Sequence, residues 1–190
     1  MAHKKGTYKI ITKKIENEYT DIAYPQFKSK PKINNLIQDM IQSFIKKETN
    51  KFLEQWNIYG DYKITLLKEN LLSIIIEGYS CLHGEDKAFY FLQSLTINIR
   101  ESYIYNFNDL FYKGSNYEYI IDKIILENIK DNNIPIIEEL ANINKNRRFY
   151  LTKDSLVIYY ELNRNSMYAS SYCIPQFNIP FNTIKNIINL

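Results

Sequence analysis

Leu71 to Arg100 reads LLSIIIEGYSCLHGEDKAFYFLQSLTINIR, and this stretch decides the fold. Two apolar runs, rich in β-branched and aromatic residues, lie on either side of the polar segment at residues 81–86. In the second run the residues expected to face a core recur with a period of two: Phe89, Phe91, Leu95, Ile97 and Ile99. Alternation of this kind is typical of a β-strand with one buried face and the other nearer water, and the first run also has the composition of a strand. We therefore predict a β-hairpin with its loop centred on His83 and Gly84.

Patterns on the N-terminal side of the hairpin predict elements that extend or cover its sheet. From Ile33 to Trp56 apolar residues recur at intervals of three and four, which predicts a long amphipathic helix with one wide apolar stripe. Alternating residues predict strands over Thr7–Glu18 and Tyr62–Leu66. The second of these strands and the hairpin together form an expected three-stranded antiparallel meander over Tyr62–Ile99.

The C-terminal side of the chain carries weaker but similar signals. Ser115 and Glu118 have the spacing of a capping box, and the isoleucines that follow fall at helical intervals, so a helix is expected at about 115–131. The remaining elements expected here are strands at 149–152 and 156–160 and a short helix at 183–189.

These elements predict an α+β fold in which antiparallel sheets pack against the long amphipathic helix and a second helix, in two small lobes. Residues 1–60, an N-terminal strand plus the long helix, are expected to be part of the first lobe. Residues 61–190 are expected to form an antiparallel-sheet lobe that carries the helices at about 115–131 and 183–189. A chain of 190 residues, 45% of them hydrophobic, is long enough to bury such cores.

Composition and charge argue against several classes of protein. Apolar and aromatic residues are plentiful and the net charge is only +3, which argues against disorder. So small a positive charge indicates no nucleic-acid partner, for which a basic stripe is expected. The sequence has no uncharged apolar stretch of about 18 residues, so no membrane span is expected, and its start lacks the apolar core of a secretory signal. The protein is therefore expected to be extracytoplasmic or at the cell surface if a leader or anchor has been removed, and otherwise cytoplasmic.

The sequence offers no convincing catalytic or metal-binding constellation. It has two histidines and two cysteines, and no HExxH, Cys-x-x-Cys, GxSxG, phosphate-loop or GxGxxG pattern, so we expect neither a metal nor a cofactor. Cys81 and His83 would point the same way on a strand, but a Cys–His nucleophile also needs an orienting group and an oxyanion site. No pair of carboxylates is identified as catalytic by sequence alone. We therefore expect a protein that is not an enzyme.

Six strings that occur in order along the chain carry a resemblance to a known family. They are Tyr24-Pro25-Gln26-Phe27, Glu77 to Gly84 (EGYSCLHG), Asp109-Leu110-Phe111, Phe149 to Thr152 (FYLT), Leu156 to Tyr160 (LVIYY) and Ile179-Pro180-Phe181. Together they resemble the extracytoplasmic domain of unknown function that RsiV-type anti-sigma factors share with the N-terminal region of PdaC-type peptidoglycan deacetylases. Members usually have Gly-Gly-Ala-His-Gly around the hairpin loop; His83 and Gly84 agree with this pattern, whereas Cys81 and Leu82 depart from it.

The resemblance covers nearly the whole chain and implies an α+β sensing module at the surface of a Gram-positive bacterium. In the anti-sigma factors this region binds lysozyme, and in the deacetylases it is an accessory module beside a catalytic domain. We therefore expect a non-catalytic binding module that recognises lysozyme or a cell-wall component such as peptidoglycan. The alternatives are a small cell-wall hydrolase or deacetylase or its accessory domain, and an intracellular structural protein.

The binding residues of such a module are expected at the end of the hairpin: Tyr79, His83, Gly84, Glu85 and Asp86. Carboxylates around this loop would attract a basic protein such as lysozyme. The alternative interpretation of these residues is an ordinary solvated loop.

Cys81 and Cys173 permit one disulfide in the extracytoplasmic setting that the resemblance implies. Such a bond would close a loop of about 90 residues and contribute about 4 to 5 kcal/mol in the chain-entropy model. Two free thiols are the alternative.

Overall fold

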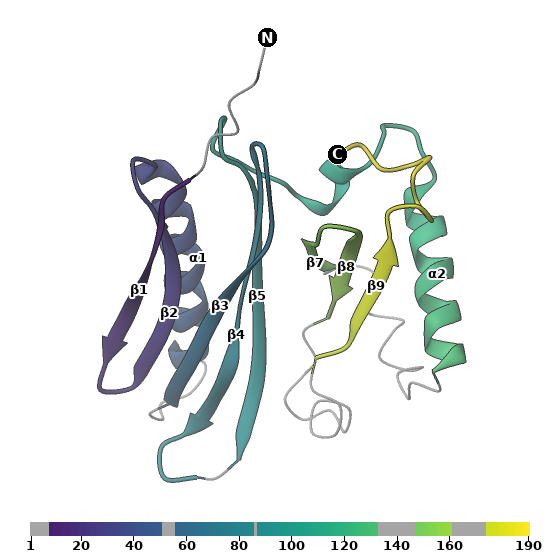
Figure 1. Cartoon of the computed structure of the whole chain (residues 1–190). Coiled ribbons are helices and arrows are strands. Elements are labelled where there is room, and N and C mark those ends of the chain that lie inside the picture. The colour runs from purple at the N-terminus through teal and green to yellow at the C-terminus, as the bar shows by residue number, and fades with distance from the viewer. Residues whose placement is uncertain (1–7, 51–55, 86, 133–146, 161–173) are drawn as a thin grey trace. The chain divides into compact units, whose positions relative to one another are not determined.

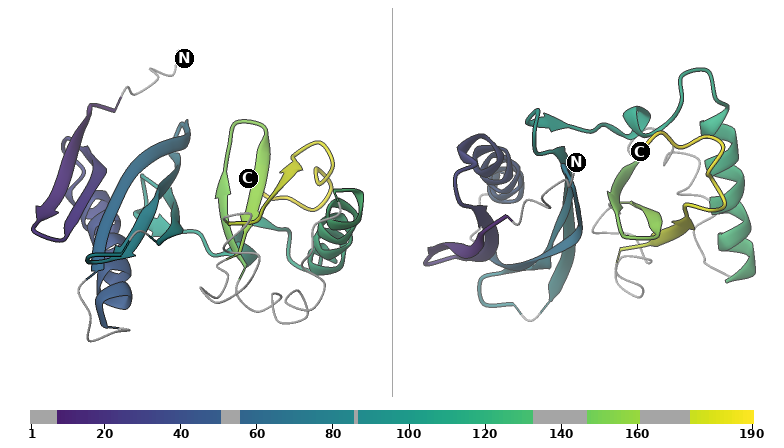
Figure 2. Two further views of the ribbon diagram at one scale, coloured as in Figure 1. Left: turned by 90° about the horizontal axis from the view of Figure 1, so that it is seen from below. Right: turned by 45° about the horizontal axis from the view of Figure 1, so that its top comes forward.

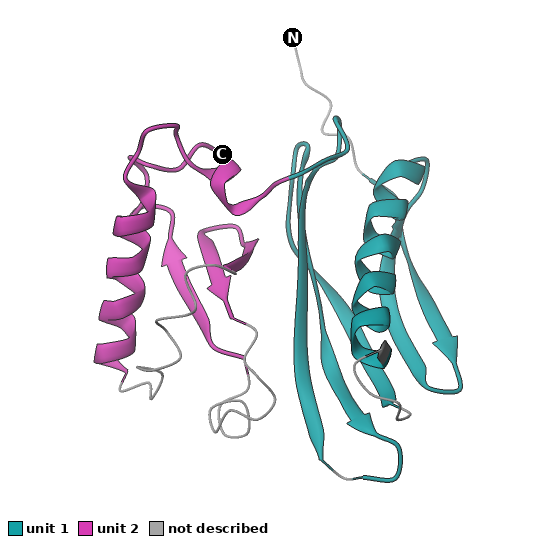
Figure 3. Ribbon diagram, turned by 180° about the vertical axis from the view of Figure 1, so that it is seen from behind, with its two compact units in different colours: residues 1–104 teal, residues 105–190 magenta. Residues whose placement is uncertain are grey.

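Two compact units make up the chain. The structure, a computed structural model, describes residues 8–50, 56–85, 87–132, 147–160 and 174–190. Unit 1 extends from Met1 to Ile104 and unit 2 from Tyr105 to Leu190 (Figure 3). Each unit combines a β-sheet with an α-helix, which confirms the predicted α+β fold (Figure 1). The division lies after Ile104 rather than near residue 60, because the long helix and the central hairpin share one core.

Within the described residues, unit 1 contains a six-stranded sheet whose strands lie in chain order. Its elements are β1 (Ile10–Asn17), β2 (Thr20–Phe27), α1 (Pro31–Asn50), β3 (Trp56–Lys68), β4 (Leu71–Leu82), β5 (Ala88–Asn98) and β6 (Tyr103–Ile104). Strands β2 and β3 are parallel, as the intervening helix requires, and the other neighbours are antiparallel. The predicted meander is confirmed as β3–β4–β5.

The core of unit 1 lies between α1 and the sheet, which curves around the helix (Figure 2). The apolar stripe of α1 supplies Ile33, Ile37, Ile41 and Phe44, all of which are buried. The ring of Phe44 lies 4.3 Å, centroid to centroid, from the ring of Phe91 on β5. Burial of an apolar side chain of this size contributes about 1.5 to 3 kcal/mol, so this interface holds α1 on the sheet.

Helix α1 ends at Asn50, and Trp56 begins β3 instead of continuing the apolar stripe that the sequence predicts. Trp56 is opposite Leu82 in the β3–β4 register, and its ring centroid lies 5.8 Å from that of Phe89. The indole therefore fills the hairpin end of the core from a strand. Apolar spacing alone cannot distinguish this position from one more turn of helix.

Two glycines face each other in the middle of the β3–β4 pair. Gly60 is opposite Gly78, and Gly78 is in turn opposite Phe91 of β5. A Cβ atom at Gly78 would lie 1.9 Å from the carbonyl oxygen of Tyr59, and one at Gly60 would lie 3.0 Å from Cζ of Phe91. The missing side chains therefore let β3 and β4 approach closely, and they let the ring of Phe91 lie over Gly60.

The face of the sheet turned away from α1 has two different parts. Toward β6 it is buried at Ser73, Ile75, Leu92 and Thr96, although the alternation predicts that Leu92 and Thr96 lie nearer water. The hydroxyl oxygens of Ser73 and Thr96 are 3.1 Å apart and share a hydrogen bond between β4 and β5. Toward the hairpin loop the same face is exposed and aromatic.

Unit 2 combines a three-stranded antiparallel sheet with α2, as far as the described residues extend. Its elements are the short 3₁₀ helix η1 (Phe107–Leu110), α2 (Tyr117–Asp131), β7 (Arg148–Leu151), β8 (Ser155–Tyr159) and β9 (Gln176–Pro180), with β8 in the middle of the sheet. The buried face of α2 carries Ile121, Ile125 and Ile129. The N-cap of α2 is Asn116 rather than Ser115, whose hydroxyl donates to a preceding carbonyl oxygen instead.

Turns replace the short helix expected over 183–189. This segment returns to the start of unit 2 and hydrogen-bonds there through its backbone. The N–H of Tyr112 donates to the carbonyl oxygen of Ile187 at 2.9 Å, and the N–H of Asn189 donates to that of Leu110 at 2.7 Å. The segment also keeps local turn bonds, such as that from the N–H of Ile187 to the carbonyl oxygen of Ile184. Local apolar spacing cannot indicate the long-range bonds.

An ion pair joins α2 to the residue before β7. The guanidinium of Arg147 contacts the carboxylate of Asp122, and the two side chains are 8% and 32% exposed. The guanidinium carbon also lies 5.5 Å from the ring centre of Phe107. Nearby, burial raises the pKa of Tyr160 to about 12, although the positive charge of Arg147 acts in the opposite direction.

We expect the free energy of unfolding of unit 2 to fall as the pH rises from about 10 to about 12. An unfolded tyrosine ionises near pH 10, whereas folded Tyr160 keeps its proton until about pH 12. The folded state therefore binds more protons in this window. The stabilisation is fully present below pH 10 and is lost as the pH passes the folded pKa, with a slope of at most about 1.4 kcal/mol per pH unit. Urea unfolding across this range should show the extra slope in the wild type and not in Tyr160→Phe; equal slopes would contradict it.

Candidate binding surface

The loop residues predicted as a binding site lie at the turn between β4 and β5. His83 and Gly84 are exposed, and Gly84 has a φ of +85°, which favours glycine. The His83 ring meets the ring of Tyr19 edge-on, with centroids 6.1 Å apart. The N–H of Glu85 closes the turn through a 3.0 Å backbone hydrogen bond. Asp86 lies outside the described residues.

Tyr79, the other predicted residue, belongs to a separate feature of the same hairpin. It is opposite Tyr59 of β3 and opposite Tyr90 of β5, so three tyrosines lie side by side across three neighbouring strands. We name Tyr59, Tyr79 and Tyr90 the tyrosine row. They are 39%, 41% and 61% exposed, and the ring centroids of Tyr59 and Tyr79 are 5.2 Å apart. Strand alternation places the row on the face away from α1.

Four carboxylates border the tyrosine row. Asp61 of β3 is opposite Glu77 of β4. Each is two residues along its strand from the tyrosine of the row, so both lie on the same face of the sheet as the row. At the other side of β3, Asp21 of β2 is in register with Tyr59, and Glu16 of β1 is opposite Asp21. We name these four residues the acidic border. All of them are at least partly exposed.

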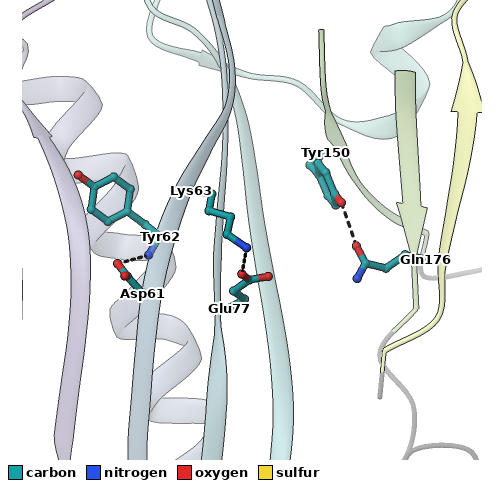
Figure 4. Close-up of polar contacts among 6 residues, drawn as sticks. All are labelled: Asp61, Tyr62, Lys63, Glu77, Tyr150 and Gln176. Carbon is teal, nitrogen blue, oxygen red and sulfur yellow. Dashed lines mark hydrogen bonds and ion pairs between the residues drawn. The ribbon is translucent and has the colours of Figure 1, made fainter. Parts of the chain in front are cut away.

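Two lysines hold carboxylates of the acidic border. Lys63 forms an ion pair with Glu77 between β3 and β4 (Figure 4). Lys14 donates a 2.9 Å hydrogen bond to Asp21, which raises the pKa of Lys14. Four carboxylates thus surround two ammonium groups, and this part of the surface is net negative although the chain carries a net charge of +3.

Sequence patterns identify Tyr79 but not its two neighbours, because the row depends on strand register. The structure pairs Cys81 with Ala88, and this register places Tyr79 opposite Tyr90. A loop centred one residue earlier, as the sequence predicts, would place Tyr79 opposite Ala88 and hide the row. Tyr59 precedes the residues where alternation predicts a strand. The signal that could have found the pair on the hairpin is the placement of both tyrosines at equal distances from the loop.

The tyrosine row has the properties of a surface that binds another molecule. Tyrosine combines a large apolar ring with a polar hydroxyl group and is enriched among the residues that dominate protein–protein affinity. Its side chain also has few rotatable bonds, so little conformational entropy is lost on contact. A row held by three paired strands is therefore a preorganised contact surface.

Other kinds of site have less support in the described part of the chain. No group of three or more His, Cys, Asp or Glu side chains is placed there to hold a metal ion. Cys81 carries a free thiol on the face of the tyrosine row, and its proposed disulfide partner Cys173 lies outside the described residues. None of the described helices has the length and apolarity needed to cross a bilayer.

A protein-family model described as "Protein of unknown function (DUF3298)" matches residues 108–182, which lie in unit 2. No curated protein sequence matches the chain.

Two crystal structures are similar to the whole chain. One is a DUF3298 family protein from Pseudomonas aeruginosa PAO1, with 12% sequence identity, a TM-score of 0.65, and coverage of 96% of this chain and 94% of that chain. The other is a member of the DUF3298 family from Bacteroides fragilis NCTC 9343, with 13% identity, a TM-score of 0.56, and coverage of 97% and 93%. At such low identity the likeness establishes the fold, and both units are included in it.

Proposed function

We propose that this chain is a non-catalytic extracytoplasmic binding module of the kind found in RsiV-type anti-sigma factors and PdaC-type deacetylases, and that its ligand is a basic protein of the lysozyme class. The tyrosine row carries this proposal. Its three rings are exposed on a paired sheet and take no part in the core of unit 1. Exposed aromatic side chains gathered at one place are characteristic of interaction surfaces.

The acidic border supports a basic ligand. Lysozymes are usually basic, and a chain with a net charge of +3 would repel them if the charge were evenly spread. Charges in solution act over about 8 Å at physiological ionic strength, so the carboxylates beside the tyrosine row determine the sign of the local interaction. Complementary local charge raises the association rate and excludes wrong partners.

The family resemblance supports the same location. The string from Glu77 to Gly84, one of the six that carry the resemblance, spans the hairpin end of β4. It contains Tyr79, the central residue of the row, together with Glu77 of the acidic border and Gly78 of the glycine pair. One of the six strings that carry the resemblance to a lysozyme-binding family thus contributes two residues, Tyr79 and Glu77, to the proposed surface.

Calorimetric titration of the purified chain with lysozyme tests the proposal. We expect saturable binding by the wild type and an affinity lower by about ten-fold or more for Tyr79→Ala, because truncation of a central aromatic contact costs about 1 to 2 kcal/mol or more. Tyr119→Ala is the matched control: Tyr119 is 64% exposed on α2 of unit 2, outside the proposed surface. This variant should bind as the wild type does.

Three other results would change the proposal in different ways. Binding to insoluble peptidoglycan, with none to lysozyme, would favour the cell-wall component as ligand. Release of soluble products from peptidoglycan, abolished in His83→Ala, would favour the hydrolase or deacetylase alternative. Binding to neither ligand at micromolar concentrations would overturn the proposed function.

A further inference from the structure

The tyrosine row and the acidic border meet in a regular array on β3 and β4. Tyr59 is opposite Tyr79, and Asp61 is opposite Glu77. On each strand the tyrosine and the carboxylate are two residues apart, so all four side chains leave the same face of the sheet, with the two rows about 7 Å apart. We name Tyr59, Tyr79, Asp61 and Glu77 the ring–carboxylate array.

This arrangement matches the chemistry of a guanidinium group. The face of an aromatic ring attracts a cation, and arginine does this more often than lysine because its planar group also stacks on the ring. The same planar group donates two parallel hydrogen bonds to a carboxylate. A ring and a carboxylate on one face, one step apart along a strand, offer both contacts to a single arginine side chain.

The protein's own lysines show that this surface attracts cations. Lys63 forms its ion pair with Glu77 of the array, and both side chains are largely in water, at 65% and 41% exposed. Lys14 is attracted in the same way. Its hydrogen bond to Asp21 raises its pKa, and the negative charge of Asp61, the other carboxylate of the array, raises it further. Ion pairs as exposed as that of Lys63 contribute little to stability, so a cation from a ligand can displace Lys63 at small cost.

We propose that the ring–carboxylate array binds an arginine side chain presented on the surface of the ligand. The guanidinium group stacks on the rings of Tyr59 and Tyr79 and donates hydrogen bonds to Asp61 or Glu77. The inference rests on the proposed function for the existence of a protein ligand, but it names a contact that can be measured without lysozyme. It also predicts that arginine-rich surfaces are preferred over lysine-rich ones of equal charge.

Fluorescence anisotropy with labelled oligo-arginine and oligo-lysine peptides of equal length tests this contact on the full chain. We expect the oligo-arginine peptide to bind several-fold more tightly than the oligo-lysine peptide. The double substitution Asp61→Asn with Glu77→Gln should weaken oligo-arginine binding by about ten-fold. Tyr79→Leu should weaken it as well, whereas Tyr79→Phe, which keeps the ring and loses only the hydroxyl group, should bind as the wild type does.

Glu101→Gln is the charge-matched control for the single substitution Glu77→Gln, because each removes one negative charge and Glu101 is an exposed acid in the turn between β5 and β6. It should leave oligo-arginine binding unchanged, and all the variants should keep the wild-type unfolding midpoint. A loss of affinity in Glu101→Gln equal to that of a single substitution in the array would show attraction by net charge only and would overturn the inference. Equal affinity for the two peptides would overturn it as well.

The same variants separate this inference from the proposed function. If lysozyme binds the wild type and the array variants equally well, the proposed function survives and the array is not the contact. If lysozyme does not bind, but oligo-arginine binds in a manner that depends on Tyr79 and on the array carboxylates, the array is a guanidinium site and its ligand is another arginine-rich protein.

Discussion

Replacement of Gly78 by alanine is expected to destabilise unit 1 by about 3 kcal/mol, the upper end of the usual range for overpacking. The new methyl group would lie 1.9 Å from the carbonyl oxygen of Tyr59, a backbone atom that cannot move without shifting β3. Because Tyr59 and Tyr79 flank this close approach, the shift should also disturb the tyrosine row. Urea unfolding measures the stability, and titration with lysozyme measures the effect on the surface.

Two other glycines provide controls for the Gly78→Ala result. Gly60→Ala would meet the ring of Phe91 at 3.0 Å, and a side chain can yield where a backbone cannot, so we expect a loss of only about 1 kcal/mol. Gly84→Ala has open space around it but a φ of +85°, and the left-handed conformation costs about 1 to 2 kcal/mol. If Gly78→Ala loses no more stability than Gly60→Ala does, the close approach of β3 and β4 does not limit this position.

Asp122→Asn is expected to destabilise unit 2 by about 2 to 3 kcal/mol. The substitution leaves the guanidinium of Arg147, which is only 8% exposed, without the carboxylate it contacts. Removal of one partner of a fully buried pair costs about 3 to 5 kcal/mol, and the partial exposure of Asp122, at 32%, lowers that figure. Urea unfolding near neutral pH, followed by a probe in unit 2, measures the loss.

The same helix offers a matched control for the buried pair. Glu127 lies 3.9 Å from Lys123 one turn along α2, and both side chains are about 60% exposed. Glu127→Gln should therefore cost no more than about 0.5 kcal/mol. Combining Asp122→Leu with Arg147→Met should restore much of the stability lost in Asp122→Asn, because no buried charge is left without its partner. Equal losses in Asp122→Asn and Glu127→Gln would show that burial of Arg147 has no energetic consequence.

Local patterns in the sequence were sufficient to predict most of the elements. When one face of a strand or helix is buried, its apolar residues recur with the period of that element. The alternation from Phe89 to Ile99 marks β5, and the stripe from Ile33 to Phe44 marks α1. The pattern fails where a distant contact decides the outcome. Trp56 continues the helical spacing, but it lies on β3 and pairs with Leu82 of the neighbouring strand β4. Residues 183–189 also have helical spacing, but they hydrogen-bond to the start of unit 2.

The candidate surface was predictable only in part, for a related reason. Tyr79 and Glu77 lie on the hairpin that the sequence identifies, and both can be found from their position beside its loop. Tyr59 and Tyr90 join them only through the registers of β3 and β5 with β4. An error of one residue in the loop centre removes Tyr90, and Tyr59 precedes the strand that the sequence predicts. The array with Asp61 depends on the same register. A binding surface that spans three strands is therefore a property of pairing, which single-strand patterns do not encode.

The return of the last described residues to the start of unit 2 has a consequence for synthesis on the ribosome. Unit 1 pairs each strand with its neighbour in the chain, so its sheet can form as soon as its own residues have emerged. The N–H of Tyr112 and the carbonyl oxygen of Leu110 find backbone partners in Ile187 and Asn189, near the end of the chain. Unit 2 therefore cannot complete its core until nearly all of its residues have left the exit tunnel, and during that interval its apolar strands are open to chaperones or to misassembly. A translational pause once residue 104 has left the exit tunnel would leave a finished tyrosine row on a chain whose second half is not yet folded.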